Sequence, residues 1–574
     1  MEATSDPGDE IEQRIRTSLR VVVMTPCWAA YSSRDGRPRF RAYGRRHIDR
    51  MRHLDKLSSD QLVALKVASA VLPFRVNDYV LDDLIDWDNI PSDPIYQMTF
   101  PQAGMLADAD FLHLKKLVLS GVDTGVIRQC VRDIQTRMNP HPGGQMELNV
   151  PTLGGAKLYG CQHKYRETVL YFPAAGQTCH AYCTYCFRWP QFVGIEHFKI
   201  AMRDPELLVS YLREHREVTD VLVTGGDPLV MSSEMLRKSI KPLLGRGLDH
   251  ITSIRIGTRA LTYWPYRFIT DRDADDLLHL FEDILHSGRR LALMAHFTHP
   301  RELRTVAARE ALRRVRCTGA VVRCQAPLVR HVNDDPAVWA DLWREQVRLG
   351  AVPYYMFVAR DTGPRAYFEM TLADGLRVYS EAISRVSGLG RTVRGPIMSA
   401  VPGKILIDGI VSINGQKVFV LKMIQGRDPS WTNRMFFARF DPQATWFDQL
   451  KPAFDGRDFF FNSSLQTANM GGWETDSVDN PDSVQHTNYG QIRCIHRRAG
   501  MTQAVRTLAS PSASGPIFLG PSRTTDDESP GSCRSLAQNE NPRTTSRIES
   551  GMTSGSACRS ENPMSMIQPR IWLE

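Results

Sequence analysis

Short apolar runs alternate with amphipathic segments through the middle of the chain. Six of these runs predict buried β-strands: Val169–Phe172, Asp220–Thr224, Ile251–Gly257, Leu291–Phe297, Ala320–Leu328 and Val352–Val358. Segments with apolar residues at helical spacing lie between them, such as SSEMLRKSIKPLL and DPAVWADLWREQVRLG. This alternation predicts an α/β fold, with a parallel sheet rolled like an open or closed barrel and helices outside it. The periodicity leaves an open doubly wound sheet as the alternative.

The regions on either side of this pattern differ in composition. Residues 1–57 show little periodicity and are predicted to be poorly ordered, whereas residues 58–150 predict an N-terminal helical region. The pattern of strands and helices occupies residues 151–405, and a β-rich extension with many aromatic residues follows in residues 406–479. Residues 480–574 hold too few apolar residues to offset the entropy of ordering, so we predict a disordered tail.

Composition narrows the class of protein. The chain of 574 residues is 42% hydrophobic and 23% charged, with a formal net charge of +8, which is ordinary for a soluble globular protein. No apolar stretch is long enough to cross a bilayer and no run of Lys and Arg is present, so we expect neither a membrane nor a nucleic-acid partner. The acidic start, Met1–Glu10, lacks the apolar core of a secretory signal. The 11 cysteines, an odd number, favour a reducing, cytoplasmic location, and the arginines after Glu10 leave a mitochondrial one open.

Three cysteines lie close together just after the first predicted strand. Cys179, Cys183 and Cys186 have the spacing C-x3-C-x2-C. Thiolates are the ligands that iron–sulfur clusters prefer, and three of them can bind three irons of a 4Fe-4S cluster while the fourth iron stays open to a small molecule. The alternatives are three buried cysteines or a zinc site. Zinc requires a fourth ligand, and His180 would have to fold back from within the loop to provide it.

Chemically useful residues follow or end each of the other predicted strands. They are Gly225, Gly226 and Asp227 at the second strand, Arg255 and Arg259 at the third, His296 and His299 at the fourth, Gln325 at the fifth, and Arg360 and Asp361 at the sixth. In a parallel β/α barrel the carboxyl ends of the strands converge on one mouth, where chemistry gathers. The shared position of these residues therefore predicts an active site at that edge of the sheet.

Six segments, in their order and spacing, resemble the lysine 2,3-aminomutase family of radical S-adenosylmethionine enzymes. They are CHAYCTYCFRW, TGGDPLV, IRIGTR, AHFTHPRE, APLVRHVND and VPYYMFV, and the resemblance extends roughly from Pro101 to Lys404. It implies an open (β/α)6 partial TIM barrel. It also implies three cofactors, namely a 4Fe-4S cluster, S-adenosyl-L-methionine and pyridoxal 5'-phosphate.

The same resemblance implies roles for individual residues beyond the three cysteines. The implied S-adenosylmethionine site consists of Tyr185, Gly225, Gly226, Asp227, His296 and Gln325. Lys404, which follows a Pro-Gly pair, would attach pyridoxal phosphate covalently. Lys164 and Arg166 would bind the phosphate, because Thr168 stands where the family has its second arginine. Arg188 would pair with the carboxylate of the substrate through its planar guanidinium.

Two positions depart from what a lysine-specific member needs. The acids that would receive the distant ammonium of lysine are replaced by Arg360 and Ala400. A cation facing a cation is repulsive, so lysine is not the expected substrate. Arg360 suits the side-chain carboxylate of an acidic amino acid such as glutamate, although a shift of one residue would bring Asp361 into the pocket instead.

The resemblance thus implies an isomerase that moves the α-amino group of an amino acid to its β-carbon through a 5′-deoxyadenosyl radical. Its partners would be a small-molecule amino acid substrate and an electron donor for the cluster, with a homo-oligomer left open. The residues leave two other functions open. One is a radical S-adenosylmethionine enzyme that catalyses another reaction without pyridoxal phosphate, and the other is an iron–sulfur-binding protein without catalytic activity.

Overall fold

The computed structural model of the protein describes residues 38–465 and contains one 11-stranded sheet. Its strands are β5 (Cys161–Tyr165), β6 (Thr168–Tyr171), β7 (Asp220–Val223), β8 (Ser253–Thr258), β9 (Arg290–His296), β10 (Val321–Leu328), β11 (Val352–Val358), β12 (Arg394–Ser399), β13 (Gly403–Ile413), β14 (Gln416–Gly426) and β15 (Met435–Arg439). The six predicted strands are confirmed as β6 to β11. The predictions for residues 1–37 and 466–574 lie outside the described residues.

The strands of this sheet lie side by side in the order in which they occur in the chain. Neighbours from β6 to β12 are parallel, whereas β5 pairs with β6, and β13 to β15 pair in turn beyond β12, in the antiparallel direction. A doubly wound sheet reverses its strand order at a switch point. The sequential order of this sheet has no such reversal, so that alternative is not found.

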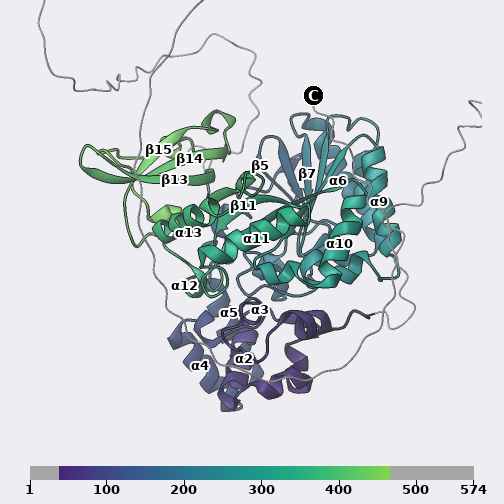
Figure 1. Ribbon diagram of the computed structural model, residues 1–574, viewed down its shortest axis with the longest axis vertical. Coiled ribbons are helices and arrows are strands. Elements are labelled where there is room, and N and C mark those ends of the chain that lie inside the picture. The colour runs from purple at the N-terminus through teal and green to yellow at the C-terminus, as the bar shows by residue number, and fades with distance from the viewer. Residues whose placement is uncertain (1–37, 466–574) are drawn as a thin grey trace, which may run out of the picture. The chain divides into compact units, whose positions relative to one another are not determined.

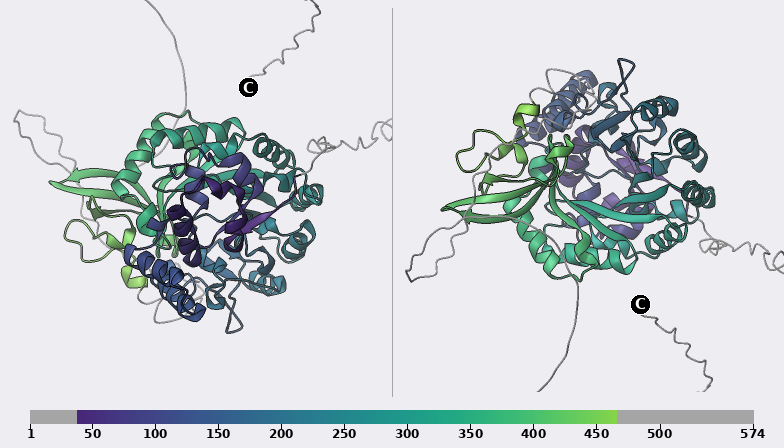
Figure 2. Two further views of the ribbon diagram at one scale, coloured as in Figure 1. Left: turned by 90° about the horizontal axis from the view of Figure 1, so that it is seen from below. Right: turned by 90° about the horizontal axis from the view of Figure 1, so that it is seen from above.

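Helices connect the parallel strands and lie on the outside of the sheet (Figure 1 and Figure 2). They are α6 (Pro205–Glu214), α7 (Ser233–Ile240), α8 (Ala260–Tyr263), α9 (Ala274–His286), α10 (Val306–Cys317), α11 (Pro336–Arg348), α12 (Arg365–Phe368) and α13 (Leu372–Ser384). Local sequence explains where several of them begin, because a side chain just before the first turn accepts a hydrogen bond from a backbone N–H of the helix. These capping residues are Asp204, Ser232, Thr305, Asp335 and Thr371.

Strand β10 shows how the two faces of the sheet differ. Val322, Cys324 and Ala326 are almost fully buried and point to the helices, whereas Arg323 and Gln325, which alternate with them, are partly exposed. Successive side chains of a strand point to opposite faces. The face of β10 that points away from the helices therefore carries partly exposed polar side chains.

The N-terminal region is mainly helical. Its helices are α2 (Ser59–Val71), α3 (Pro94–Thr99), α4 (Asp108–Leu119) and α5 (Thr124–Arg137), with the short 3-10 helices η1 (Arg45–Arg50) and η2 (Arg52–Lys56) and the strand pair β1 (Ala42–Gly44) and β2 (Arg75–Asn77). Residues 38–57 correct the prediction of poor order for residues 1–57. Ile48 of η1, Leu54 of η2 and Met51, the extended residue between the two helices, are all buried in the N-terminal core.

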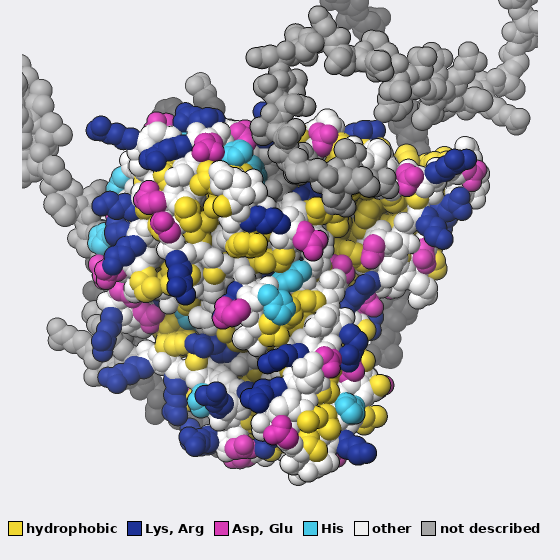
Figure 3. Space-filling view, turned by 180° about the vertical axis from the view of Figure 1, so that it is seen from behind, with side chains coloured by type: hydrophobic (Ala, Val, Ile, Leu, Met, Phe, Trp, Pro, Cys, Tyr) yellow, Lys and Arg dark blue, Asp and Glu magenta, His cyan; other side chains and the backbone are white. Residues whose placement is uncertain are grey.

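Buried apolar residues form separate clusters in the parts of the molecule. One lies between the parallel sheet and its helices, a second fills the N-terminal region, and a third lies in the extension formed by β13 to β15. Strand β13 begins at Gly403, so the predicted boundary at residue 405 falls inside a strand that continues the main sheet. No helix within residues 38–465 is both long and apolar enough to cross a membrane. Acidic and basic side chains are mixed over the face drawn in Figure 3.

Candidate active site

The loop after β6 carries the C-x3-C-x2-C motif, and the N-terminal region holds this loop in place. The N–H of Tyr182 donates to the carbonyl of Arg75 over 2.8 Å, and the N–H of Thr184 donates to the carbonyl of Met98 over 2.8 Å. Backbone groups that are removed from water need such partners. The cysteine loop is therefore fixed by residues far away in the sequence.

Cys179, Cys183 and Cys186 are all free thiols, with Cys183 buried and the other two partly exposed. Burial, and then the neighbouring Cys183 thiol, raises the pKa of Cys186 to about 12. Burial also raises the pKa of Cys179, with Asp227 and the other two thiols adding to the effect. The three sulfur atoms thus lie within electrostatic reach of one another. Metal coordination removes the proton of such a thiol, because the cation stabilises the thiolate.

The donor set of the cysteine loop fits an iron–sulfur cluster better than a single metal ion. Within residues 38–465, no three or more His, Cys, Asp or Glu side chains are placed to hold one metal ion. A cluster separates its cysteines more widely, because each thiolate binds a different iron atom. His180, the candidate fourth zinc ligand, packs edge-on against Phe40 with ring centroids 5.4 Å apart. Cluster binding by the three cysteines stays a prediction.

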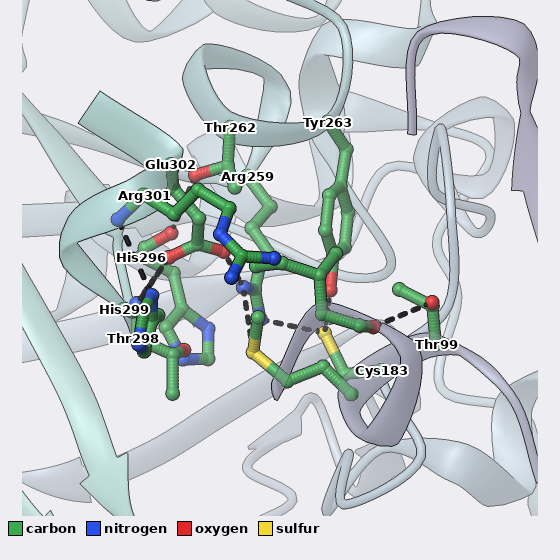
Figure 4. Close-up of polar contacts among 12 residues, drawn as sticks. Thr99, Cys183, Arg259, Thr262, Tyr263, His296, Thr298, His299, Arg301 and Glu302 are labelled. Atoms are coloured by element: carbon green, nitrogen blue, oxygen red, sulfur yellow. Dashed lines mark hydrogen bonds and ion pairs between the residues drawn. The ribbon is translucent and has the colours of Figure 1, made fainter. Parts of the chain in front are cut away.

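Arg259 connects Cys183 to the loop after β9 (Figure 4). Its Nη1 donates to Cys183 Sγ over 2.8 Å and to Tyr185 Oη over 2.7 Å, and its Nη2 forms a buried ion pair with Glu302. Tyr263 Oη lies 3.5 Å from the same sulfur. Arg259 was predicted from its place at a strand end, whereas Glu302 and Tyr263 were not predicted, although Glu302 ends the segment AHFTHPRE and Tyr263 lies shortly after IRIGTR.

Glycines permit a close approach between the end of β7 and the cysteine loop. A Cβ on Gly226 would lie 2.3 Å from the carbonyl oxygen of Thr178, and Gly225 has a φ of +148°. The carboxylate of Asp227 accepts from Leu229 N–H over 3.0 Å, and it also accepts from the Thr258 hydroxyl and the Arg259 N–H. These bonds tie β7 to β8. The predicted contact between Asp227 and an ammonium group stays a prediction.

His296 and Gln325 lie next to each other on the inner face. They are directly paired in the register of β9 and β10, which supports their prediction as members of one site. His296 Nε2 is buried and has no hydrogen-bond partner within residues 38–465. Burial, and then Arg259, lowers the pKa of His296. A neutral imidazole with an unpaired nitrogen suits a role as a ligand-contacting group.

Lys404 is the second residue of β13, and its amine lies among aromatic and cationic side chains. Its Nζ donates to Gln425 Oε1 over 2.6 Å and lies 4.6 Å from the ring centroid of Tyr165 and 5.6 Å from that of Tyr355. Burial lowers the pKa of Lys404 to about 7, and nearby arginines, Arg255 first among them, add to the effect. An amine with this pKa is a nucleophile near neutral pH.

Further cations surround the turn that precedes Lys404. Lys164 donates to the carbonyl of Ala400, and Arg427 Nε donates to the carbonyl of Val401 over 2.8 Å. Arg360 Nη2 donates to the carbonyl of Pro142 over 3.2 Å. Burial lowers the pKa of all three cations, with Arg427 at about 10. Arg427 directly follows β14 and belongs to none of the motifs in the sequence, so it was not predicted as a site residue.

The predicted phosphate residues are not all part of this cationic group. A register shift between His163 and Tyr165 breaks the alternation of β5, so Lys164 lies on the same side as Tyr165. Arg166 is exposed in the turn between β5 and β6. The Thr168 hydroxyl donates to Asp220 over 3.0 Å. Of these residues, the structure brings only Lys164 close to Lys404.

Arg188 and Arg360 both lie near the ring of Phe187. The Arg188 guanidinium is 4.9 Å from the Phe187 ring centroid and 4.5 Å from that of Phe172, and the Arg360 guanidinium is 5.6 Å from Phe187. Burial lowers the pKa of Arg188 to about 10. Arg188 Nη1 is buried without a hydrogen-bond partner in the described part of the chain. A carboxylate would satisfy this unpaired donor.

A cavity of about 250 Å³ lies beside the turn that precedes Lys404. Arg360, Asp361 and Ala400 all line it, together with aromatic residues that include Trp446. Arg360 Nε and Asp361 Oδ1 are 3.6 Å apart. Arg360 and Ala400, the two positions that depart from a lysine-specific enzyme, therefore line the same cavity. Asp361 neutralises part of the charge of Arg360.

The sequence as a whole is similar to known aminomutases. An Aquifex aeolicus protein named "Putative L-lysine 2,3-aminomutase" is 29% identical over 404 residues, which are 70% of this chain and 94% of the relative. A second Aquifex aeolicus protein with that name is 33% identical over 335 residues, which are 58% of this chain and 77% of the relative. The chain belongs to the lysine 2,3-aminomutase family. As an aminomutase, this family member is an isomerase.

Other similarities of this aminomutase cover a smaller part of the chain. Glutamate 2,3-aminomutase of Clostridioides difficile is 29% identical over 211 residues, which are 37% of this chain and 47% of the relative. A Kitasatospora setae structure, the radical S-adenosylmethionine methyltransferase TsrM with cobalamin and a 4Fe-4S cluster, has a TM-score of 0.23 and 12% identity, and covers 33% of this chain and 37% of that one. This structural likeness is too low to support an argument. No protein-family model matches the chain.

Proposed function

We propose that this protein is a radical S-adenosylmethionine and pyridoxal phosphate-dependent amino acid 2,3-aminomutase. The observation that carries the proposal is the Lys404 pocket. A lysine with a pKa of about 7 lies there among buried cations at the inner face of the parallel sheet. Its amine is free near neutral pH, and the surplus of positive charge suits a phosphate and the carboxylates of an amino acid.

The strands β6 to β11 and their helices would form the open (β/α)6 partial TIM barrel that the family implies. The sequential strand order, the parallel pairing and the polar inner face of the sheet support this proposal. In such a barrel, one site collects the loops at the carboxyl ends of all the strands. This arrangement would bring the cysteine loop after β6 and the Lys404 turn after β12 to the same space.

We propose that Cys179, Cys183 and Cys186 hold the 4Fe-4S cluster, with S-adenosylmethionine bound beside it. When bound, the cluster and S-adenosylmethionine supply the radical that removes a β-hydrogen, and pyridoxal phosphate carries the amino group as it migrates. Gly225 and Gly226 leave room for a ligand beside the cysteine loop. The cluster also requires an external electron donor.

The side chains of this protein would bind and orient the substrate. Arg188 lies close to two aromatic rings and has one donor without a partner in the described part of the chain. Its planar guanidinium would donate to the α-carboxylate of the substrate. Lys404 would hold pyridoxal phosphate until the substrate displaces it. The buried aromatic residues around Lys404 would keep water away from the reacting groups.

We propose that the substrate is an acidic amino acid rather than lysine. Arg360 lines the cavity together with Asp361 and the exposed Asp448. Lys164 and Arg427 lie close to Arg360 outside this lining, so three cations stand against two carboxylates. An ammonium group placed there would be repelled, whereas a carboxylate would relieve the repulsion among the cations.

Anaerobic reconstitution with iron, sulfide and pyridoxal phosphate tests the cofactor assignment. Borohydride trapping and peptide mass spectrometry should locate the cofactor on Lys404. Lys404→Ala should lose the trapped cofactor, and the control variant Lys417→Ala, on the exposed start of β14, should keep it. Release of 5′-deoxyadenosine without any cofactor on Lys404 would instead indicate a radical enzyme that does not use pyridoxal phosphate. A loaded cluster that cleaves no S-adenosylmethionine would contradict catalytic activity altogether.

A panel of amino acids tests the substrate. The reconstituted enzyme should convert glutamate or aspartate to a β-amino acid faster than it converts lysine, as detected by mass spectrometry. Arg360→Asp should lower the rate with acidic substrates and raise the rate with lysine relative to them. If lysine reacts fastest with the unmodified enzyme, the assignment of Arg360 is wrong.

A further inference from the structure

Arg427 is a buried guanidinium that no carboxylate of the described residues neutralises. Its side chain is 6% exposed. It donates to the carbonyl of Val401 over 2.8 Å, to the carbonyl of Leu148 over 3.2 Å and to Asn149 Oδ1 over 2.5 Å. All of these acceptors are neutral. A buried charge is costly unless an opposite charge lies nearby, so the surroundings of Arg427 call for an anion.

A second cation lies directly beside Arg427. Lys164 donates to the carbonyl of Ala400, and Arg427 donates to the next carbonyl along the chain, that of Val401. Arg427 is the first of the charges that lower the pKa of Lys164. Two cations thus meet at consecutive carbonyls of the turn that leads to Lys404. An anion that faced both cations would attract each of them and so offset their mutual repulsion.

The ring of Tyr165 lies at the same place. It is buried, and the amines of Lys164 and Lys404 lie 5.4 Å and 4.6 Å from its centroid. The Tyr165 hydroxyl is within reach of the Ser399 side chain, just before the turn that leads to Lys404. Lys164 and Arg427 therefore converge beside Lys404 with a hydroxyl group nearby, and this combination of donors is typical of a phosphate site.

We propose that Arg427, together with Lys164, binds the phosphate of pyridoxal phosphate. This inference rests on the proposed function. It assigns the second phosphate cation to the C-terminal extension, in place of the segment around Arg166 and Thr168. Arg166 is exposed, and the hydroxyl of Thr168 already donates to Asp220. The β13–β14 extension would thus be part of the cofactor site.

A purely structural role for Arg427 predicts a different result. Its bonds to Val401, Leu148 and Asn149 connect the Lys404 turn to the segment before β5, so a variant could weaken every ligand of Lys404 by moving this turn. Pyridoxal, which lacks the phosphate but keeps the aldehyde, separates the two roles. A phosphate contact affects only pyridoxal phosphate, whereas a shifted turn affects both compounds.

The experiment titrates the reconstituted holoprotein, stripped of its aldehyde cofactor, with pyridoxal phosphate and with pyridoxal, and follows absorbance and borohydride trapping at Lys404. Arg427→Gln should weaken pyridoxal phosphate binding about tenfold or more, because a hydrogen bond to a charged group contributes roughly 1.5–3 kcal/mol. Binding of pyridoxal should not change. Lys164→Gln should give the same pattern. Arg434 is an exposed residue of the segment between β14 and β15, which also contains Arg427, and Arg434→Gln should change neither titration.

Each result decides between the roles. Equal weakening of both compounds in Arg427→Gln, or unchanged binding of both, would overturn the phosphate assignment. If Arg427→Gln does not fold, Arg427→Lys decides, because it keeps the charge but loses the planar pair of donors. If Arg427→Lys prefers pyridoxal phosphate over pyridoxal by the same ratio of affinities as the wild type, the assignment is also overturned. Wild-type protein that binds neither compound at Lys404 would contradict the proposed function rather than the role of Arg427.

Discussion

Several charged side chains of the site are buried, and their partners determine what each one does. Arg259 has a carboxylate partner, since Glu302 balances its charge, and Cys183 and Tyr185 accept from its Nη1. Lys404 and Arg427 have only neutral hydrogen-bond acceptors. A balanced buried charge stabilises one arrangement of the chain, whereas an unbalanced one favours a ligand of opposite charge.

Removal of Arg259 should destabilise the fold. Arg259→Gln leaves Glu302 charged in a place where its side chain is 0% exposed, and we expect a loss of about 3–5 kcal/mol in the free energy of unfolding. Urea unfolding of the metal-free protein measures this loss. Arg237→Gln, which breaks a partly exposed ion pair with Asp283, should cost about 1 kcal/mol or less. If the two variants lose the same free energy of unfolding, the Arg259–Glu302 ion pair is not buried as described.

The low pKa of Lys404 predicts how cofactor attachment depends on pH. Only the neutral amine reacts, and burial lowers the pKa of Lys404 from 10.5 to about 7. Attachment of pyridoxal phosphate should therefore increase as the pH rises through about 7 and level off about one unit higher. Stopped-flow absorbance across this range measures the midpoint. A midpoint near 10 would show that the amine is as solvated as an ordinary lysine.

The same shift has a consequence for stability. Above pH 7 the folded chain has released the Lys404 proton, while the unfolded chain keeps it up to about 10.5. The unfolded state binds more protons in this window, so the contribution of Lys404 to stability increases with pH between these values. Lys404→Met should remove this increase, as measured by thermal unfolding across the window.

At the scale of elements, irregular backbone places the reactive groups. The register shift in β5 turns Lys164 toward the site, and another shift follows Lys404 in β13. Glycines at the end of β7 let that strand approach the backbone of the cysteine loop. Bulges and glycines re-aim side chains at the ends of strands, where regular alternation would bury them or point them away.

Gly226 should not tolerate a side chain. A Cβ at this position would lie 2.3 Å from the backbone oxygen of Thr178, which belongs to the cysteine loop and cannot rotate away. We expect Gly226→Ala to lower the iron content after reconstitution and to slow S-adenosylmethionine cleavage. Gly409→Ala, where no atom lies within 4 Å of the added carbon, is the matched control. Normal iron content in Gly226→Ala would mean that the loop has room to move.

At the scale of the whole described molecule, the N-terminal region supports the cysteine loop. Asn77, which is 0% exposed, donates to the carbonyls of His180 and Tyr263 over 3.1 Å and 2.9 Å and accepts from Val80 N–H over 3.1 Å. One amide thus joins the N-terminal region, the cysteine loop and the segment after β8. Ala181 and Cys183 belong to the same apolar core as the N-terminal helices.

Loss of the Asn77 amide should loosen this connection. Asn77→Ala leaves buried carbonyls without donors, and each unsatisfied group costs about 1–3 kcal/mol. We expect a lower melting temperature and faster loss of iron to a chelator. Gln129→Ala removes an exposed amide bonded to Asp133 and should change neither quantity. Retention of iron in a destabilised Asn77→Ala protein would show that the loop is held without the N-terminal region.

The sequence by itself determined the elements and the chemistry that depends on local order. Apolar periodicity located the strands from β6 to β11, because a buried strand needs a run of apolar side chains wherever it lies in the fold. The spacing of Cys179, Cys183 and Cys186 indicated a shared ligand, since residues of one short loop stay close together. The cofactor-binding role of Lys404, which follows a Pro-Gly pair, was implied by the resemblance alone.

Only the tertiary structure decided which distant residues meet. Arg427 and Lys164 are far apart in the sequence, and β14 and β5 stand toward opposite ends of the strand order, so the two residues meet because the sheet curves and brings its ends together. Arg166 is closer to Lys164 in the chain but lies in an exposed turn. The order of residues 38–57 also depended on a core formed with later segments. Burial and long-range pairing are properties of the folded chain, and local sequence does not encode them.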